Sequence, residues 1–219
     1  MSERIYVNND WRFSEQFDRE MTKFHYDDSR LRQVRLPHTC REVPFHYFDE
    51  QIYQMVCGYR KVLFIAEEWR GKVIILTMEG AAHESEGFLN GEKIGEHHCG
   101  YTAFSMDISA YVRFGEENIL AVRLDTREDR NIPPFGYVVD YMTYGGIYRD
   151  MYLEIKNPSY MEDVFLWSEV SLKQQKARLY AKIKLAGRKA VQSLRQYIRK
   201  KGEEAYRFLG EQKVVSTGT

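Results

Sequence analysis

Short apolar or alternating runs, each bounded by a turn signal, follow one another from Tyr59 to Ile155 and constrain the fold most. One of them contains Asn90-Gly91, a pair that favours a two-residue type I′ hairpin because both central residues need positive φ. Helical periodicity is nearly absent. Short strands separated by turns predict an all-β, antiparallel sandwich. The runs are Tyr59–Ala66, Val73–Met78, Phe88–Ile94, Ala103–Ile108, Asn118–Leu124 and Met151–Ile155.

Two stretches of the chain lack these strand signals. Residues 1–50 are polar and irregular, and we expect loops there, including Leu36-Pro37-His38. Arg127–Tyr144 contains Ile132-Pro133-Pro134, which cannot occupy a central strand because proline lacks the amide hydrogen that a sheet needs. The sequence therefore predicts a long connection before the last strand of the sandwich.

A second domain is expected to begin at Asn157-Pro158-Ser159, which gives domains at residues 1–157 and 158–219. In Ala177–Leu185 the pattern alternates, which predicts a strand whose apolar residues face a core. Ser193–Lys200 is interpreted as a strand in a hairpin with Ala205–Leu209, with a basic helix as the alternative. The inward residues of the alternating strand are predicted to be Leu179, Ala181, Ile183 and Leu185. Because an immunoglobulin-like sandwich takes ~100 residues, we expect this second domain to be truncated.

Composition excludes some classes of function. Lys plus Arg and Asp plus Glu number 32 each, so the net charge is zero, which argues against a nucleic-acid partner. No run reaches the ~18 apolar residues of a membrane span, and no secretory segment precedes the polar start. The three cysteines, Cys40, Cys57 and Cys99, are too few and too scattered for a disulfide framework, so plain thiols in a cytoplasmic protein are expected. No cofactor is expected.

Several sequence blocks point to a family. They are Leu36-Pro37-His38, Tyr59-Arg60-Lys61, Trp69–Lys72, Leu89-Asn90-Gly91, Ile94–His97, Gly100–Phe104, Asp107-Ile108-Ser109 and Gly145–Asp150, in that order. Together they resemble the N-terminal sugar-binding domain of glycoside hydrolase family 2, the group of β-galactosidases, β-glucuronidases and β-mannosidases. The resemblance implies a jelly-roll (galactose-binding-domain-like) sandwich, then an immunoglobulin-like sandwich, then a catalytic TIM barrel, and a carbohydrate substrate.

The residues that the family uses for catalysis are missing from this sequence. A retaining glycosidase needs two carboxyl groups about 5 Å apart, one as acid/base and one as nucleophile. The family's acid/base glutamate normally follows an asparagine, and no Asn-Glu pair occurs here. We therefore expect no catalytic residue and no activity in this chain alone.

Asp140 is the first candidate for substrate contact. The resemblance implies this role, because β-galactosidase-type members place an acidic residue shortly before the Gly-Ile-Tyr-Arg-like block, and that residue helps to hold the sugar. A carboxylate can accept hydrogen bonds from sugar hydroxyls and so orient the substrate. The alternative is a loop aspartate that caps a turn. The sequence does not decide between them.

His97 is the second candidate, in a loop that can approach the pocket in the family. A histidine with a structural hydrogen bond is the alternative. A metal site at His97-His98-Cys99 is disfavoured, because adjacent residues of an extended chain point to opposite faces and zinc needs four convergent ligands. The block Gly145–Asp150 is interpreted as structural, with Arg149 and Asp150 in an ion pair or bound to backbone carbonyls.

The sequence leaves three hypotheses for function. The first is the non-catalytic N-terminal portion of a β-galactosidase-like, retaining family 2 enzyme, which shapes the substrate pocket and the assembly, expected to be a homo-oligomer. The second is a free-standing carbohydrate-binding module. The third is a structural domain that mediates oligomers.

Overall fold

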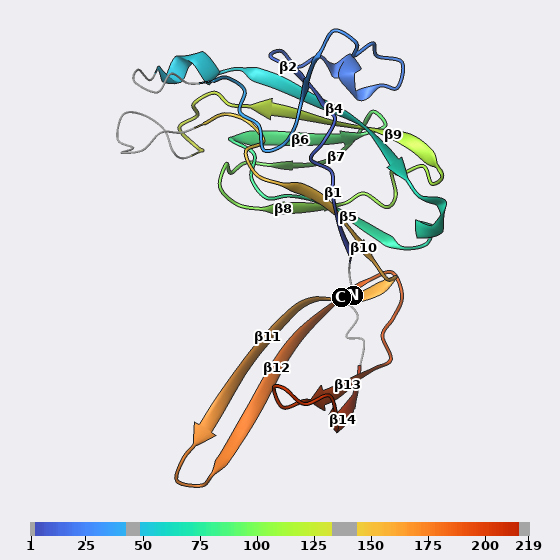
Figure 1. The fold of residues 1–219 in the computed structure, drawn as a ribbon, viewed down its shortest axis with the longest axis vertical. Coiled ribbons are helices and arrows are strands. Elements are labelled where there is room, and N and C mark those ends of the chain that lie inside the picture. Colours follow the sequence, from blue (N-terminus) through green and yellow to red (C-terminus); the bar gives the residue numbers. More distant parts are fainter. Residues whose placement is uncertain (1–2, 43–48, 133–143, 215–219) are drawn as a thin grey trace. The chain divides into compact units, whose positions relative to one another are not determined.

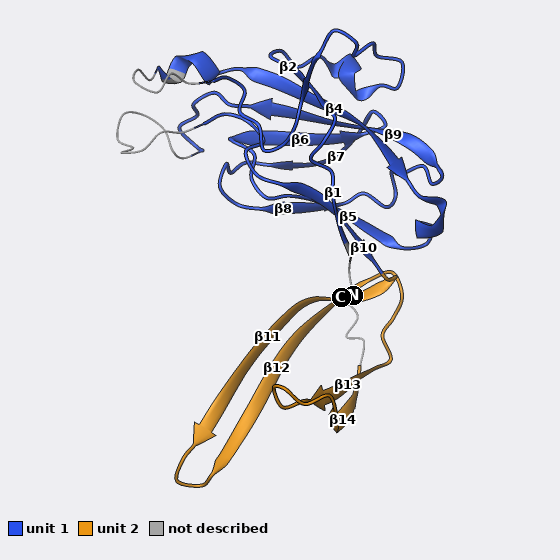
Figure 2. Cartoon of the chain, viewed as in Figure 1, with its two compact units in different colours: residues 1–156 blue, residues 157–219 orange. Residues whose placement is uncertain are grey.

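The computed structural model describes residues 3–42, 49–132 and 144–214, which form two compact units, Met1–Lys156 and Asn157–Thr219 (Figure 2). The expected domain boundary at Asn157-Pro158-Ser159 lies at this division. Each unit is described by itself below.

The first unit is built from two antiparallel sheets (Figure 1). Within the described residues, one sheet has the strand order β3-β2-β4-β9-β6-β7 and the other has the order β1-β10-β5-β8. The strands are β1 Glu3–Tyr6, β2 Trp11–Ser14, β3 Arg32–Val34, β4 Val56–Ile65, β5 Val73–Met78, β6 Glu84–Leu89, β7 Glu92–His97, β8 Phe104–Asp107, β9 Glu116–Asp125 and β10 Met151–Lys156. Three short 3₁₀ helices, η1 Arg19–Thr22, η2 Glu50–Tyr53 and η3 Glu67–Trp69, lie between them. No helix in the described ranges has the length and apolar character needed to cross a membrane.

A single apolar core fills the first unit. The larger sheet contributes Trp11, Tyr59 and Leu120, and the smaller sheet contributes Leu76 and Leu153, all of them buried. Each buried leucine stabilises the fold by roughly 1.5–3 kcal/mol relative to an exposed one. β5 is buried at every position and lies between β10 and β8 in the smaller sheet. The expected all-β sandwich is confirmed.

Several strand predictions are confirmed and one expectation is wrong. Asn90 and Gly91 have φ of 53° and 93° and join β6 to β7, as the type I′ hairpin requires. The described residues 3–42, however, hold three strands and a 3₁₀ helix where loops were expected. Strands of three or four residues are too short to show a clear alternation. They form because they add to longer strands, as when β1 pairs with β10 from the other end of the unit.

The backbone of the block Gly145–Asp150 is hydrogen-bonded to two connections that are distant from it in sequence. The amides of His38 and Cys40 donate to the carbonyls of Ile147 (2.8 Å) and Gly145 (2.9 Å). On its other side, Gly146 exchanges two hydrogen bonds with Ala82, at 2.9 and 3.3 Å. Ala82 lies in the segment that carries the chain from β5 in the smaller sheet to β6 in the larger one. This block therefore fixes the geometry of both sheets at one end of the sandwich.

Side chains of the same block add further contacts. The Arg149 guanidinium donates to the backbone carbonyls of Glu79 (3.4 Å) and Tyr101 (3.2 Å), which confirms the predicted binding of carbonyls. The Tyr148 hydroxyl donates to the carbonyl of Gly100. Asp150 accepts a hydrogen bond from the Asn8 amide at 2.9 Å.

The second unit contains two antiparallel hairpins. One joins β11 Ser159–Ser171 to β12 Lys176–Gly187, and the other joins β13 Ser193–Ile198 to β14 Arg207–Lys213. The second hairpin confirms the strand interpretation of 193–200 and shows that the basic helix is wrong. The sequence analysis did not predict β11. That these hairpins begin an immunoglobulin-like sandwich stays a prediction.

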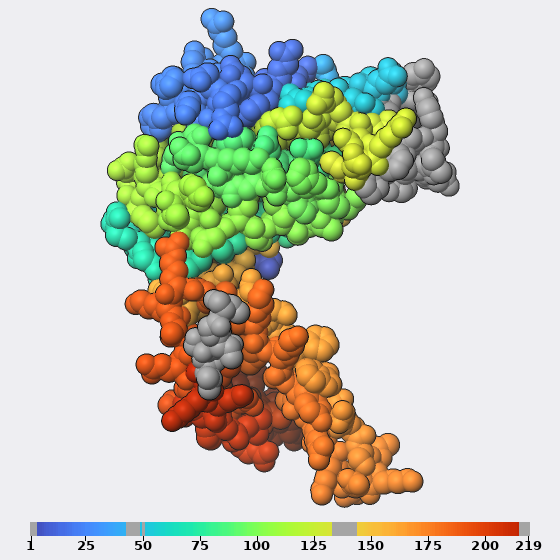
Figure 3. Space-filling model, turned by 180° about the vertical axis from the view of Figure 1, so that it is seen from behind, coloured from blue at the N-terminus to red at the C-terminus, as the bar shows by residue number. Residues whose placement is uncertain are grey.

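Apolar side chains on the β11–β12 hairpin remain largely open to solvent. Register confirms the predicted alternation of β12: Leu166 lies opposite Ala181, and Val164 lies opposite Ile183, on one face. Leu179, predicted to face a core, is nevertheless 59% exposed, whereas Ile183 and Leu185, predicted on the same face, are partly buried. In the space-filling view the orange hairpin is a narrow strip of side chains (Figure 3).

Replacing Gly146 tests the close approach between its Cα and the backbone of His38. Its φ is 140°, and a Cβ there would lie 2.3 Å from the carbonyl oxygen of His38. Gly146→Ala should therefore lower the free energy of unfolding by about 3 kcal/mol, through strain and overpacking together. Urea denaturation followed by tryptophan fluorescence measures this change.

The matched control is Gly71→Ala. Gly71 also has positive φ, 82°, but a Cβ there would have no neighbour within 4 Å. Only the backbone strain remains, so we expect a loss of about 1 kcal/mol. If the free energy of unfolding fell by the same amount in the two variants, this would contradict the close approach at Gly146.

Candidate functional site

Three strands of the larger sheet end at the same edge of the sandwich. Glu84 at the start of β6 lies opposite Asp125 at the end of β9, and Ser85 lies opposite His97 at the end of β7. β4 also begins here, with Val56 opposite Asp125. Antiparallel pairing thus brings the ends of these strands and their connections together, as Figure 1 shows.

A hollow of about 240 Å³ opens at this edge. Its lining in the described residues is mostly charged: His83, Glu84, Asp125, Arg127, Glu128, Asp129 and Ile132. Ile132 is the last described residue before the segment 133–143. Asp140, the first candidate for substrate contact, belongs to that segment and lies outside the described residues.

Asp125 is the best-bound carboxylate in the hollow. It accepts hydrogen bonds from Nε (2.9 Å) and Nη2 (2.7 Å) of Arg127 and from Nη2 of Arg123 (3.3 Å). Burial favours a higher pKa for Asp125, but the hydrogen bonds and charge of Arg127, with the charge of Arg123, outweigh it and lower the pKa. Asp125 is therefore an ionised acceptor that orients Arg127, and it is unsuited to donate a proton.

His83 places a buried ring nitrogen at the same hollow. The residue is 7% exposed, and its backbone amide donates to the carbonyl of Asp125 at 3.0 Å. Its Nδ1 is buried and finds no hydrogen-bond partner within the ranges that the structure describes. Burial lowers the pKa of His83, against the opposing charges of Asp125 and Glu128, so the ring is neutral at pH 7. A neutral imidazole can either donate or accept a hydrogen bond.

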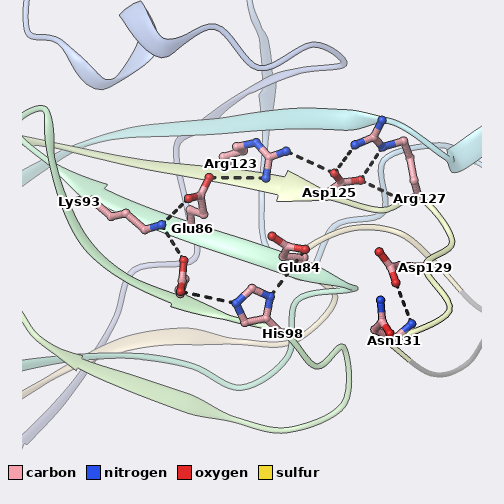
Figure 4. Close-up of polar contacts among 10 residues, drawn as sticks. Glu84, Glu86, Lys93, His98, Arg123, Asp125, Arg127, Asp129 and Asn131 are labelled. Carbon is pink, nitrogen blue, oxygen red and sulfur yellow. Dashed lines mark hydrogen bonds and ion pairs between the residues drawn. The ribbon is translucent and has the colours of Figure 1, made fainter.

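A row of charged side chains crosses β7, β6 and β9 next to the hollow (Figure 4). Glu86 and Glu96 lie directly opposite each other, and their repulsion is relieved because Lys93 Nζ contacts both, Glu96 at 2.6 Å. Arg123 Nη1 approaches Glu86 at 3.5 Å, which continues the row to Asp125. His98 lies 3.6 Å from both Glu84 and Glu96. The exposed pairs at Lys93 and His98 fix side-chain positions more than they stabilise the fold, whereas Arg123, Glu86 and Asp125 are partly buried.

His97, the second candidate, contacts the connection that follows β7 and the first residue of β8. Its Nε2 lies 2.8 Å from the Thr102 hydroxyl, and its ring stacks on Phe104 with centroids 4.3 Å apart. Partial burial lowers the pKa of His97, and the neighbouring charge of His98 lowers it further. The described lining of the hollow does not include His97. These contacts match the structural alternative, and contact between His97 and a substrate stays a prediction.

The lining of the hollow suits binding of a polar ligand. The described residues contain no group of three or more His, Cys, Asp or Glu side chains that could hold a metal ion. The hollow offers donors from Arg127 and His83 beside several carboxylate oxygens. Alternating donors and acceptors of this kind complement the hydroxyl groups of a sugar.

Sequence reasoning missed most of the residues that line the hollow. A usable signal was the charged run Asp125–Arg130, which begins at the last residue of β9. His83 and Glu84 lie far from that run in sequence. They join it only through the pairing of β6 with β9, which the sequence pattern does not specify.

Comparison with known proteins agrees with this architecture. Residues 19–158 match the family described as glycosyl hydrolases family 2, sugar binding domain. The β-galactosidase of Thermoanaerobacter pseudethanolicus is 41% identical over 159 residues, which is 72% of this chain and 21% of that protein. The β-glucuronidase of Bacteroides fragilis is 34% identical over 193 residues, 85% of this chain and 26% of that protein.

A solved structure shows the same fold. The crystal structure of a Bacteroides uniformis β-glucuronidase superimposes with a TM-score of 0.69 at 28% identity, over 77% of this chain and 20% of that one. This chain spans about a quarter or less of the length of these relatives. The family match covers most of the chain, including strands β3 to β10 of the sandwich, and on this basis the chain belongs to glycoside hydrolase family 2, with residues 19–158 as its sugar-binding domain.

Proposed function

We propose that this chain is the N-terminal, non-catalytic portion of a larger retaining family 2 glycosidase, in which it helps to shape the substrate pocket. The observation that carries the proposal is the polar hollow around His83, Asp125 and Arg127, at the strand ends from which the segment bearing Asp140 departs. The hollow supplies fixed donors and acceptors, and Asp140 supplies a further acceptor for sugar hydroxyls.

Catalysis is assigned to the rest of the larger enzyme. The retaining mechanism requires an acid/base and a nucleophilic carboxyl group about 5 Å apart. In the hollow, Asp125 is held ionised by two arginines and so cannot act as the acid. The relatives are about four to five times longer than the part that this chain matches, which leaves room for a catalytic domain.

We propose a β-galactoside as the substrate class. Two relatives that match at 41% and 40% identity are named β-galactosidases, whereas the relative named β-glucuronidase from B. fragilis matches at 34%. We further propose a cytoplasmic homo-oligomer that engages neither nucleic acid nor membrane. The zero net charge supports the exclusion of nucleic acid.

A free-standing carbohydrate-binding module is the second candidate, and one observation favours it. On the β11–β12 hairpin, Phe165 and Trp167 are 60% and 42% exposed. Their rings lie 5.5 Å apart, and Trp167 stacks on Tyr180 at 5.0 Å. Exposed aromatic rings with polar neighbours are a common means of binding sugars. This candidate requires that the isolated chain bind a glycan through these rings.

An activity screen tests the proposed function. The full-length protein that contains this chain should hydrolyse a chromogenic β-galactoside faster than the matching β-glucuronide and β-mannoside, with retention of anomeric configuration. The comparison of kcat/KM among the three substrates decides the substrate class. A preference for the glucuronide would overturn the β-galactoside assignment, and no hydrolysis of any glycoside would overturn the glycosidase assignment.

Asp140→Ala in the same full-length protein tests the candidate contact. Loss of a hydrogen bond from a charged acceptor to a sugar hydroxyl should reduce kcat/KM by about tenfold or more, through a higher KM or a lower kcat. The unfolding midpoint should stay unchanged. Glu117→Ala is the control, because Glu117 is an exposed carboxylate at the opposite end of β9 and should leave the kinetics as they are. Unchanged kinetics in Asp140→Ala would remove it from the site.

A further inference from the structure

Two cysteines that are distant in sequence meet in the core of the first unit. Cys40 and Cys57 are both completely buried, and their Sγ atoms lie 3.3 Å apart. The sequence predicted only separate thiols, because residue 40 belongs to a connection and residue 57, which is 17 positions further along the chain, belongs to β4. Their proximity arises from the tertiary fold.

Both cysteines are held at rigid positions. The amide of Cys40 donates to the carbonyl of Gly145 at 2.9 Å, within the block that joins the two sheets. Cys57 lies in β4 and pairs with Leu124 of β9. The sulfurs would need to approach by only about 1.2 Å to reach the disulfide bond length of about 2.05 Å. A small adjustment of side-chain torsions supplies such a movement.

Polar neighbours surround one of the two sulfurs. The Tyr59 hydroxyl lies 3.9 Å from the Sγ of Cys40 and 2.9 Å from Nδ1 of His38. The hydrogen bond between the two sulfurs lowers the pKa of Cys40, although burial opposes this. The same hydrogen bond, together with burial, raises the pKa of Cys57. Cys40 is therefore the sulfur that ionises first and the better nucleophile.

We propose that Cys40 and Cys57 are a site of reversible oxidation, at which a small peroxide converts the dithiol into an intramolecular disulfide. This inference goes beyond the proposed function and holds whether or not the chain contacts a sugar. A peroxide is the fitting oxidant because both sulfurs are buried, and a bulky disulfide reagent could not reach them in the folded protein.

The chemistry balances in two steps. The Cys40 thiolate attacks one oxygen of hydrogen peroxide, the O–O bond breaks, and hydroxide leaves and takes up the thiol proton as water. The sulfur of Cys57 then attacks the resulting sulfenic acid, the S–O bond breaks, and the Cys57 proton leaves with the oxygen as a second water. Two thiols and one peroxide thus yield one disulfide and two waters, and a dithiol reductant reverses the change.

The crosslink would tighten the part of the sandwich that carries the candidate site. It closes the segment 41–56, whose residue Met55 receives a hydrogen bond from the Thr126 amide at 2.9 Å. Thr126 and Gly145 stand at the two ends of the connection that contains Asp140. Closing this loop lowers the conformational entropy of the unfolded chain. The disulfide form should therefore melt at a temperature several degrees higher.

Oxidation of the 219-residue chain carrying Cys99→Ser tests the proposal, since this change removes the remaining thiol. Treatment of the folded protein with dilute hydrogen peroxide should remove two hydrogen atoms from the intact mass. A non-reducing peptide map should show one crosslinked pair of peptides containing Cys40 and Cys57. Dithiothreitol should restore the original mass and the original melting temperature.

Two further variants in the Cys99→Ser background act as controls, Cys40→Ser and Cys57→Ser. On oxidation, neither variant should lose the mass of two hydrogen atoms, and neither should melt at a higher temperature. The outcome does not depend on their folding, because the parent chain is the primary measurement. The proposal is overturned if both thiols of the folded parent survive peroxide, or if the sulfurs take up oxygen separately without a crosslink.

Discussion

Gly146 lies against the backbone of His38 and Thr39 so closely that a Cβ would meet the His38 carbonyl oxygen at 2.3 Å. On its other side it exchanges two hydrogen bonds with Ala82, in the crossing from the smaller sheet to the larger one. Only glycine combines this approach with a φ of 140°. The connection between the two sheets at this end of the sandwich depends on that contact. The start of β10 depends on it as well.

The position of the candidate site depends on this connection between the two sheets. With the crossing segment fixed, His83 and Glu84 enter β6 opposite the end of β9, where Asp125 and Arg127 lie. The charges there are paired and directed, since Asp125 orients Arg127 and the row through Glu86 and Lys93 fixes the adjacent face. A rigid frame with a few directed polar groups is suited to orienting a sugar, whereas the bond-breaking carboxylates belong to the proposed remainder of the enzyme.

Local sequence patterns predicted the features that are local in origin. The turn at Asn90-Gly91, the buried run Val73–Met78 and the carbonyl contacts of Arg149 follow from residue chemistry, and the structure confirms them. The strands before residue 50 could not be predicted, because they are short and gain their hydrogen bonds from distant partners. The same limit applies to the hollow and to the Cys40–Cys57 pair, which exist only through β6–β9 pairing and through the contact between Cys40 and Gly145. Asp140 came from the family resemblance and lies outside the described residues.

We propose that this domain shapes a pocket completed by the rest of the enzyme and that, by itself, it binds sugar weakly or not at all. Calorimetric titration of the isolated 219-residue chain with a β-galactoside and a panel of other glycans tests this most directly. The account predicts millimolar affinity or none for every glycan. Micromolar binding to a defined glycan, abolished by Trp167→Ala, would contradict it and establish a free-standing binding module.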